Sequence, residues 1–258
     1  GKKLSGEVVI SGSKNASLPI IISSLLFNDA ISFENVPKVR DIYTLISLIR
    51  VLGREVDFDE EKEILKISKK NKDKYFAPYS IMKTMRAGVL VLAPLLAKFG
   101  KARVSLPGGC SIGARPVNLH LDALKKLGAK INVKSGYIDA SAPKGLLGAN
   151  IKFPIISVGA TESIIIAAVL AKGVTKIRNA AIEPEIIDLI KFLNKCGADI
   201  KYNSKRKIII KGVKYLYPIK HRIIPDRIEA ATYAIAALIT NGKLIIKKVL
   251  VVVVQFHQ

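Results

Sequence analysis

The stretch LIRVLGREVDF, residues 48–58, decides the fold because two later stretches repeat its pattern, ALKKLGAKINV at 123–133 and FLNKCGADIKY at 192–202. Each reads as the end of an amphipathic helix, a glycine that ends the helix, and an alternating strand. The equivalent glycines are Gly53, Gly128 and Gly197. The chain is therefore predicted to repeat a unit of about 70 residues.

A second shared pattern lies upstream in each unit: an apolar helix, a polar turn and a strand. It occurs at 16–37, 85–107 and 160–180, and a fourth copy begins at 228–249. Each full unit then reads strand, helix, strand, helix, strand, strand, which predicts an α/β fold of βαβαββ repeats. The first helix of each copy is apolar nearly all round, so we expect it to be buried. The fourth copy stops before its second helix, which suggests a shortened chain.

Composition limits the classes of protein that fit. Half of the 258 residues are hydrophobic, yet no apolar run reaches the roughly 18–20 residues of a membrane span. The N-terminal stretch reads as a strand and lacks the apolar segment of a signal peptide. Only Cys110 and Cys196 occur, and neither they nor the three histidines show metal-ligand spacing. A reducing, cytoplasmic location is therefore predicted.

The charge is strongly positive, +22 from 42 Lys and Arg against 20 Asp and Glu. Such an excess favours anionic partners. The lysines, however, are spread along the whole chain, and the few aromatic residues are not interleaved with them. We therefore expect neither nucleic acid nor a membrane as a partner. A basic nucleic-acid-binding protein remains a competing hypothesis, and salt-sensitive retention on DNA would reveal it.

The starts of the apolar helices gather unpaired backbone N–H groups, which bind anions. In SGSKNA (11–16), Ser13 or Asn15 can cap the helix while Lys14 presents an ammonium group there. The simpler alternative is a helix cap beside a solvated lysine. In KTMRAG (83–88), Arg86 stands at the equivalent start, where its guanidinium can hold a phosphate or carboxylate.

The other two helix starts carry different residues. In SVGATES (157–163), small side chains let the backbone approach a ligand closely. The simpler alternative is a tight turn capped by Thr161. In PDRIEAA (225–231), Asp226 is the candidate cap.

The stretch VSLPGGCSIGARPVNLH (104–120) places Cys110 in a glycine-rich loop, five residues before Arg115. Backbone amides and the arginine could stabilise a reactive thiolate, but an ordinary half-buried loop cysteine fits equally well. Cys196 ends an amphipathic helix and is predicted to be a small core residue.

Six motifs occur in an order that resembles the UDP-N-acetylglucosamine 1-carboxyvinyltransferase family of enolpyruvyl transferases: SGSKNA, KTMRAG, SLPGGCSIGARPVNLHL, SVGATES, EPEIIDL and IPDRIEAATY. The resemblance covers nearly everything from residue 3 to about 250. It implies an inverse α/β barrel with two domains and an active site between them. Residues 14–224 would be one complete domain, and residues 1–13 and 225–258 fragments of the second.

The resemblance also implies a reaction and a site. The family joins phosphoenolpyruvate to the 3′-hydroxyl of UDP-N-acetylglucosamine and releases phosphate, for peptidoglycan synthesis, without metal or organic cofactor. Cys110 would act as general acid or in product release, and Lys14, Arg86 and Arg115 would hold phosphoenolpyruvate. The sugar nucleotide would contact Asn15, its uridine would meet Arg115, Pro116, Val117, Asn118 and Leu119, and its diphosphate Ser157, Val158 and Gly159.

Two departures from the family pattern matter. Asn118 stands where the family usually has aspartate, so we expect altered nucleotide affinity without loss of binding. The family's aspartate base and a further phosphoenolpyruvate-binding arginine belong to a part of the second domain that this sequence lacks. Two hypotheses follow: an enolpyruvyl transferase, or a non-catalytic remnant that retains at most ligand binding.

Overall fold

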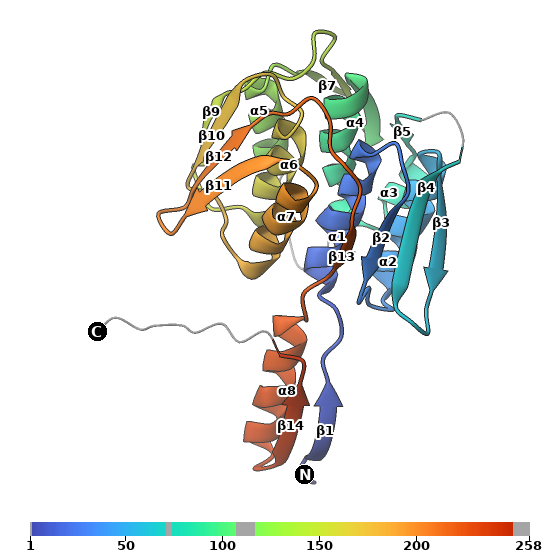
Figure 1. Cartoon of the computed structure of the whole chain (residues 1–258), viewed down its shortest axis with the longest axis vertical. Helices are drawn as coiled ribbons and strands as arrows, with labels where there is room; N and C mark the ends of the chain where they lie inside the picture. The colour runs from blue at the N-terminus through green and yellow to red at the C-terminus, as the bar shows by residue number, and fades with distance from the viewer. Residues whose placement is uncertain (1, 71–73, 107–116, 250–258) are drawn as a thin grey trace.

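The computed structural model describes residues 2–70, 74–106 and 117–249, which form a body and a narrow stalk (Figure 1). In the body, three four-stranded sheets surround a group of helices. The stalk extends below the body and holds one helix and a two-stranded sheet. Within the described residues, no helix combines the length and apolar character of a membrane span.

The three sheets of the body share one strand order. A short edge strand pairs in parallel with the strand that follows an apolar helix, and an antiparallel hairpin completes the sheet. The first sheet contains β13 (Lys220–Arg222), β2 (Ile31–Glu34), β4 (Ile64–Lys69) and β3 (Arg54–Asp59). The second contains β5 (Phe76–Ala77), β6 (Lys101–Ser105), β8 (Tyr137–Ser141) and β7 (Lys130–Lys134). The third contains β9 (Asn150–Lys152), β10 (Val174–Arg178), β12 (Lys207–Lys211) and β11 (Asp199–Asn203).

The helices follow the predicted alternation. The apolar, buried ones are α1 (Lys14–Ser23) with the 3₁₀ turn η1 (Ser24–Leu26), α4 (Leu92–Phe99) after the 3₁₀ helix η2 (Arg86–Val91), and α6 (Val158–Ala168). The amphipathic ones are α2 (Arg40–Val51), α5 (Asn118–Lys126) and α7 (Pro184–Lys195), and a short α3 (Tyr79–Met82) precedes η2. The glycines predicted to end the amphipathic helices have φ values of 96°, 90° and 97°, a conformation that glycine adopts without strain.

The first sheet is closed by a distant segment. The sequence pattern predicts an opening strand before each apolar helix, and β5 and β9 fill that role in the second and third units. The strand before α1, β1 (Ser5–Val9), instead leaves the body and pairs with β14 (Lys243–Lys247). Its place beside β2 is taken by β13, so the end of the third unit completes the first.

The stalk consists of β1, β14 and α8 (Arg227–Ile239), the helix of the fourth copy. Asp226 caps α8 as predicted: its Oδ1 accepts the backbone N–H of Ile228 at 2.8 Å. The expectation that this apolar helix is buried is wrong, because only Ala230 is buried along it. Leu238 and Ile239 are 79% and 80% exposed, since β1 and β14 cover only part of the helix.

Candidate functional site

The two chain segments that join body and stalk run side by side. The backbone N–H of Ser13 donates to the carbonyl of Ile224 at 2.8 Å, and that of Asp226 donates to the carbonyl of Ser11 at 2.9 Å. The Glu229 carboxylate accepts the Ser11 backbone N–H at 2.9 Å. These bonds fix the starts of α1 and α8 next to each other.

Lys14 lies at this junction. Ser13 caps α1 by accepting the backbone N–H of Ala16 at 3.3 Å, which settles the choice between Ser13 and Asn15 as the cap. The Lys14 backbone N–H donates to Oδ2 of Asp226 at 3.3 Å. Its ammonium lies 3.0 Å from Oδ2 of Asp41, and 42% of its side chain is exposed. Lys14 is thus ion-paired and still open to a ligand.

A hollow of about 490 Å³ opens between the starts of α1 and α8. It combines an ammonium group and the N-terminal end of α1 with carboxylates from the stalk. Its lining residues are Lys14, Asn15, Asp226, Ile228, Glu229, Thr232 and Tyr233.

The starts of α5 and α6 form a second polar region. Ser157 caps α6 by accepting the Ala160 backbone N–H at 3.3 Å. The alternative of a turn capped by Thr161 is wrong, because that hydroxyl donates to the Ser157 carbonyl at 2.7 Å and accepts the Ala181 backbone N–H at 3.0 Å. Thr161 therefore fastens α6 to the segment before α7.

His120 brings this region together and was missed by sequence reasoning, which weighed histidines only as metal ligands. Its Nδ1 lies 2.7 Å from Oγ of Ser163. A Cβ atom on Gly159 would lie 3.0 Å from Cε1 of His120, so the ring packs directly on the glycine. The stretch Val117, Asn118 and Leu119 thus stands beside Ser157, Val158 and Gly159, two sets of residues that the sequence placed in one site.

Three glutamates from the SVGATES and EPEIIDL motifs form a further feature at the starts of α6 and α7, and no local pattern in the sequence predicts that they meet. Burial, together with the charges of Glu185 and Glu183, raises the pKa of Glu162 to about 8. Glu162 is 5% exposed and Glu185 3%. The Glu185 carboxylate accepts a hydrogen bond from the Nε–H group of Arg227, on the stalk, at 2.9 Å. The starts of α6, α7 and α8 therefore meet in one charged cluster.

Several predicted residues lie outside this description. Cys110, Arg115 and Pro116 are not among the described residues. Arg86 begins η2 as predicted, but its side chain lies outside the described part of the chain. Cys196 is fully buried, which confirms its prediction as a core residue, and burial raises the pKa of its thiol to about 12.

Comparison with known proteins identifies the family. Residues 1–257 match the family described as EPSP synthase (3-phosphoshikimate 1-carboxyvinyltransferase). The chain belongs to the EPSP synthase family. Within this family it is similar to UDP-N-acetylglucosamine 1-carboxyvinyltransferase of Pelagibacter ubique, with 57% identity over 94% of this chain and 58% of the relative. The enzyme of the same name from Endomicrobium trichonymphae is 52% identical over 97% of this chain and 59% of its own length.

Solved structures of an enolpyruvyl transferase and of an EPSP synthase confirm the predicted fold. The enolpyruvyl transferase NikO from Streptomyces tendae superposes with a TM-score of 0.75 at 22% identity, over 90% of this chain and 55% of that one. An EPSP synthase from Acinetobacter baumannii gives 0.71 at 18% identity, over 90% and 53%. At these identities the likeness concerns the fold alone. The chain spans between half and three fifths of the proteins it matches.

Proposed function

We propose that the chain binds the substrates and takes part in catalysis of enolpyruvyl transfer from phosphoenolpyruvate to the 3′-hydroxyl of UDP-N-acetylglucosamine. The observation that carries the proposal is the 57% identity to a relative named for this activity. The reaction supplies peptidoglycan precursors in the cytoplasm, and through them cell-wall biogenesis, cell shape and division. Residues 14–224 act as one complete domain, and the stalk belongs to a second.

The sugar nucleotide binds at the starts of α5 and α6. The first N–H groups of α6 and its dipole favour the diphosphate, which Ser157, Val158 and Gly159 meet through their backbone. The uridine lies along Val117–Leu119, where Asn118 is exposed. The contact between His120 and Gly159 supports this arrangement, because it holds the two helix starts together.

Phosphoenolpyruvate binds where Lys14, Arg86 and Arg115 meet its phosphate and carboxylate. The exposed ammonium of Lys14 at the start of α1 supports this role. C3 of phosphoenolpyruvate gains a proton while the sugar oxygen attacks C2, and the hydroxyl proton goes to a base. The tetrahedral intermediate then loses the C3 proton and inorganic phosphate, which restores the double bond. Cys110 is the general acid or assists product release.

Phosphate release tests the proposal. The purified chain is given both substrates, each substrate alone, and both substrates with the Cys110→Ala variant. Release that needs both substrates and falls at least tenfold in the variant supports catalysis by these 258 residues.

The alternative is a non-catalytic remnant that retains at most ligand binding. It predicts no phosphate release but calorimetric binding of UDP-N-acetylglucosamine that weakens in Ser157→Ala. Absence of both release and binding would contradict both functions.

A further inference from the structure

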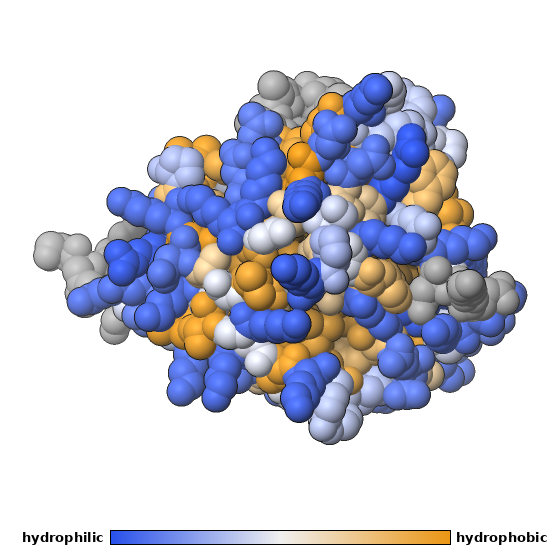
Figure 2. Space-filling view, turned by 90° about the horizontal axis from the view of Figure 1, so that it is seen from above, coloured by the Kyte–Doolittle hydropathy of each residue, from blue (hydrophilic) through white to orange (hydrophobic). Residues whose placement is uncertain are grey.

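The shared strand order of the three sheets allows their outer faces to be compared position by position. Hydrophilic side chains project along much of the rim of the molecule when it is seen from above (Figure 2). The three faces differ in net charge and not in polarity. Since the units are repeats within one chain, each sheet serves as a control for the others.

The outer face of the first sheet is electrically balanced. Lys220 and Arg222 on β13 both reach the Glu34 carboxylate on β2, at 2.5 and 3.7 Å. Asp57 on β3 lies opposite Lys66 on β4. The charged residues of this face are Glu34, Glu55, Asp57, Asp59, Lys66, Lys220 and Arg222.

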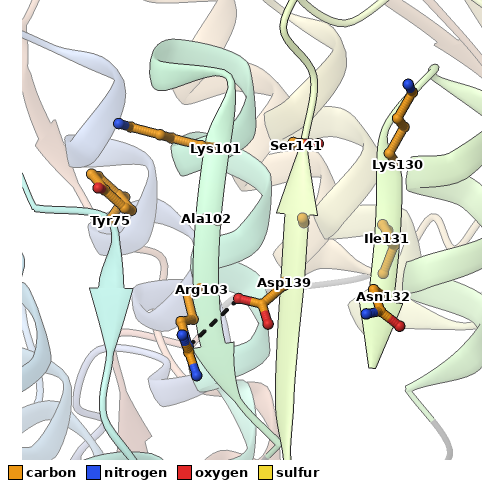
Figure 3. Close-up of a pocket in the computed structure, with 10 residues that line it drawn as sticks. Tyr75, Lys101, Ala102, Arg103, Lys130, Ile131, Asn132, Asp139 and Ser141 are labelled. Carbon is orange, nitrogen blue, oxygen red and sulfur yellow. Dashed lines mark ion pairs between the residues drawn. The ribbon is translucent and has the colours of Figure 1, made fainter. Parts of the chain in front are cut away.

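The second sheet is moderately basic, and its cations are partly engaged. Its outer face bears a shallow hollow of about 530 Å³, shown in Figure 3. There the Lys101 ammonium lies 4.1 Å from the centre of the Tyr75 ring, and Nε of Arg103 lies 3.5 Å from Oδ1 of Asp139. The other cations of this face are Lys130 and Lys134 on β7.

The third sheet concentrates positive charge. Its exposed outer positions carry Lys152, Lys176, Arg178, Lys201, Lys207 and Lys211, against Asp199 alone. Arg178 stands directly opposite Lys152 on one side and Lys207 on the other. Like charges in such cross-strand positions destabilise a sheet. Among the described residues, no carboxylate lies within ion-pair distance of any of these six cations.

The lysine-rich composition of the chain does not account for this face. A general excess of lysine would make all three outer faces basic, whereas the face of the first sheet is balanced. The geometry also argues against nucleic acid. The face is four strands wide, whereas a DNA groove admits a helix or a two-stranded ribbon. Tyr202 is paired with Ile208, which faces the core, so the outer face offers no aromatic platform for bases.

We propose that the outer face of the third sheet, β9–β12, docks on a bilayer surface that carries anionic headgroups. A bilayer is planar and continuous, so it can meet all six cations at once. The exposed aliphatic side chains of Val174 and Ile209 lie among the cations and suit the interfacial region of a bilayer. The charges that repel one another in the free protein are neutralised there. This docking is independent of the proposed transferase activity. It departs from the expectation, drawn from the spread of lysines along the chain, that a membrane is not a partner.

Sedimentation with vesicles tests the proposal. The full chain is mixed with phosphatidylcholine vesicles, and with vesicles in which about a third of the lipid is phosphatidylglycerol. We expect binding to the anionic vesicles only, and weaker binding as salt rises. Each cation near an anionic surface contributes roughly fivefold in affinity, so the triple variant Lys176→Gln, Lys207→Gln, Lys211→Gln should bind about a hundredfold more weakly.

A matched triple variant on the balanced sheet removes the same net charge: Lys66→Gln, Lys220→Gln and Arg222→Gln. It should retain affinity within about threefold. An equal loss of vesicle affinity in both triple variants would show that binding depends on net charge alone, which would overturn the proposal. The absence of any vesicle binding would overturn it as well. Binding of DNA that is lost with the third-sheet triple, without vesicle binding, would assign the face to nucleic acid instead.

The single variant Arg178→Gln gives a readout that does not depend on the triple variant folding. It removes the cation that faces two others, so the melting temperature should rise while vesicle affinity falls about fivefold. The melting temperature is measured without vesicles. If it falls in Arg178→Gln while the vesicle affinity also falls about fivefold, the like-charge argument is contradicted.

Discussion

Glu162 shows how strongly one residue's surroundings decide its chemistry. Its raised pKa of about 8 means that the folded protein holds a proton that the unfolded chain releases above pH 4.5. The stabilising effect of that proton is complete below about pH 4.5 and is lost as pH rises through about 8. We expect Glu162→Gln to be more stable than the wild type at pH 8 by roughly 1–3 kcal/mol.

Urea unfolding from pH 5 to 9 measures this effect. The wild-type free energy of unfolding should decline across that range, and the variant's should be flatter. Glu61→Gln, in an exposed turn, is the control and should follow the wild type. Parallel curves for the wild type and Glu162→Gln would contradict the assignment.

Gly12 is a second residue whose identity is dictated by its neighbours. A Cβ atom there would lie 1.7 Å from the backbone carbonyl oxygen of Asn35. The segment that joins the stalk to α1 would therefore have to move. Gly12→Ala should cost about 3 kcal/mol or more in unfolding free energy. Gly136→Ala has open space and a φ of 77°, so it should cost only about 1–2 kcal/mol of backbone strain. Equal losses in denaturant titrations would refute the steric argument.

Among the secondary structure elements, β13 holds the first and third units together. His221 on this strand is buried, its Nε2 lies 3.1 Å from Oδ1 of Asp188 on α7, and its ring packs against Phe192. His221→Ala would leave the Asp188 carboxylate buried with only the Ile224 backbone N–H, at 3.3 Å. We expect a loss of about 2–4 kcal/mol.

Chemical denaturation checks this, and His221→Gln should recover part of the loss because its amide can donate to Asp188. Lys220→Ala, the exposed neighbour, should cost about 1 kcal/mol or less. A loss in His221→Ala as small as in Lys220→Ala would show that β13 does not fasten the sheet.

For the whole molecule, body and stalk should differ in local stability. In α6 every residue from Ala160 to Ala168 is buried, whereas α8 buries only Ala230. Amides in α8 should therefore exchange with solvent through local opening, at least a hundredfold faster than those in α6. Hydrogen–deuterium exchange read by mass spectrometry measures this. Equal protection of the two helices would mean that the stalk is stabilised as firmly as the body.

The amino-acid sequence by itself determined the repeated units, the apolar helices, the glycines that end the amphipathic helices and the Asp226 cap. These features depend on local periodicity and on bonds within a few residues, so the pattern of residues is sufficient. The sequence also predicted that the α5 and α6 stretches belong to one site, because both contain motifs of a family that the chain resembles.

Only the tertiary structure decided which distant groups meet. Four features join residues that are far apart in the chain. They are the replacement of β1 by β13 beside β2, the contact of His120 with Gly159, the shared burial of Glu162 and Glu185, and the cluster of cations on the third sheet. Strand partners and buried charges depend on long-range contacts and on which surfaces remain in water. No spacing along the chain encodes them.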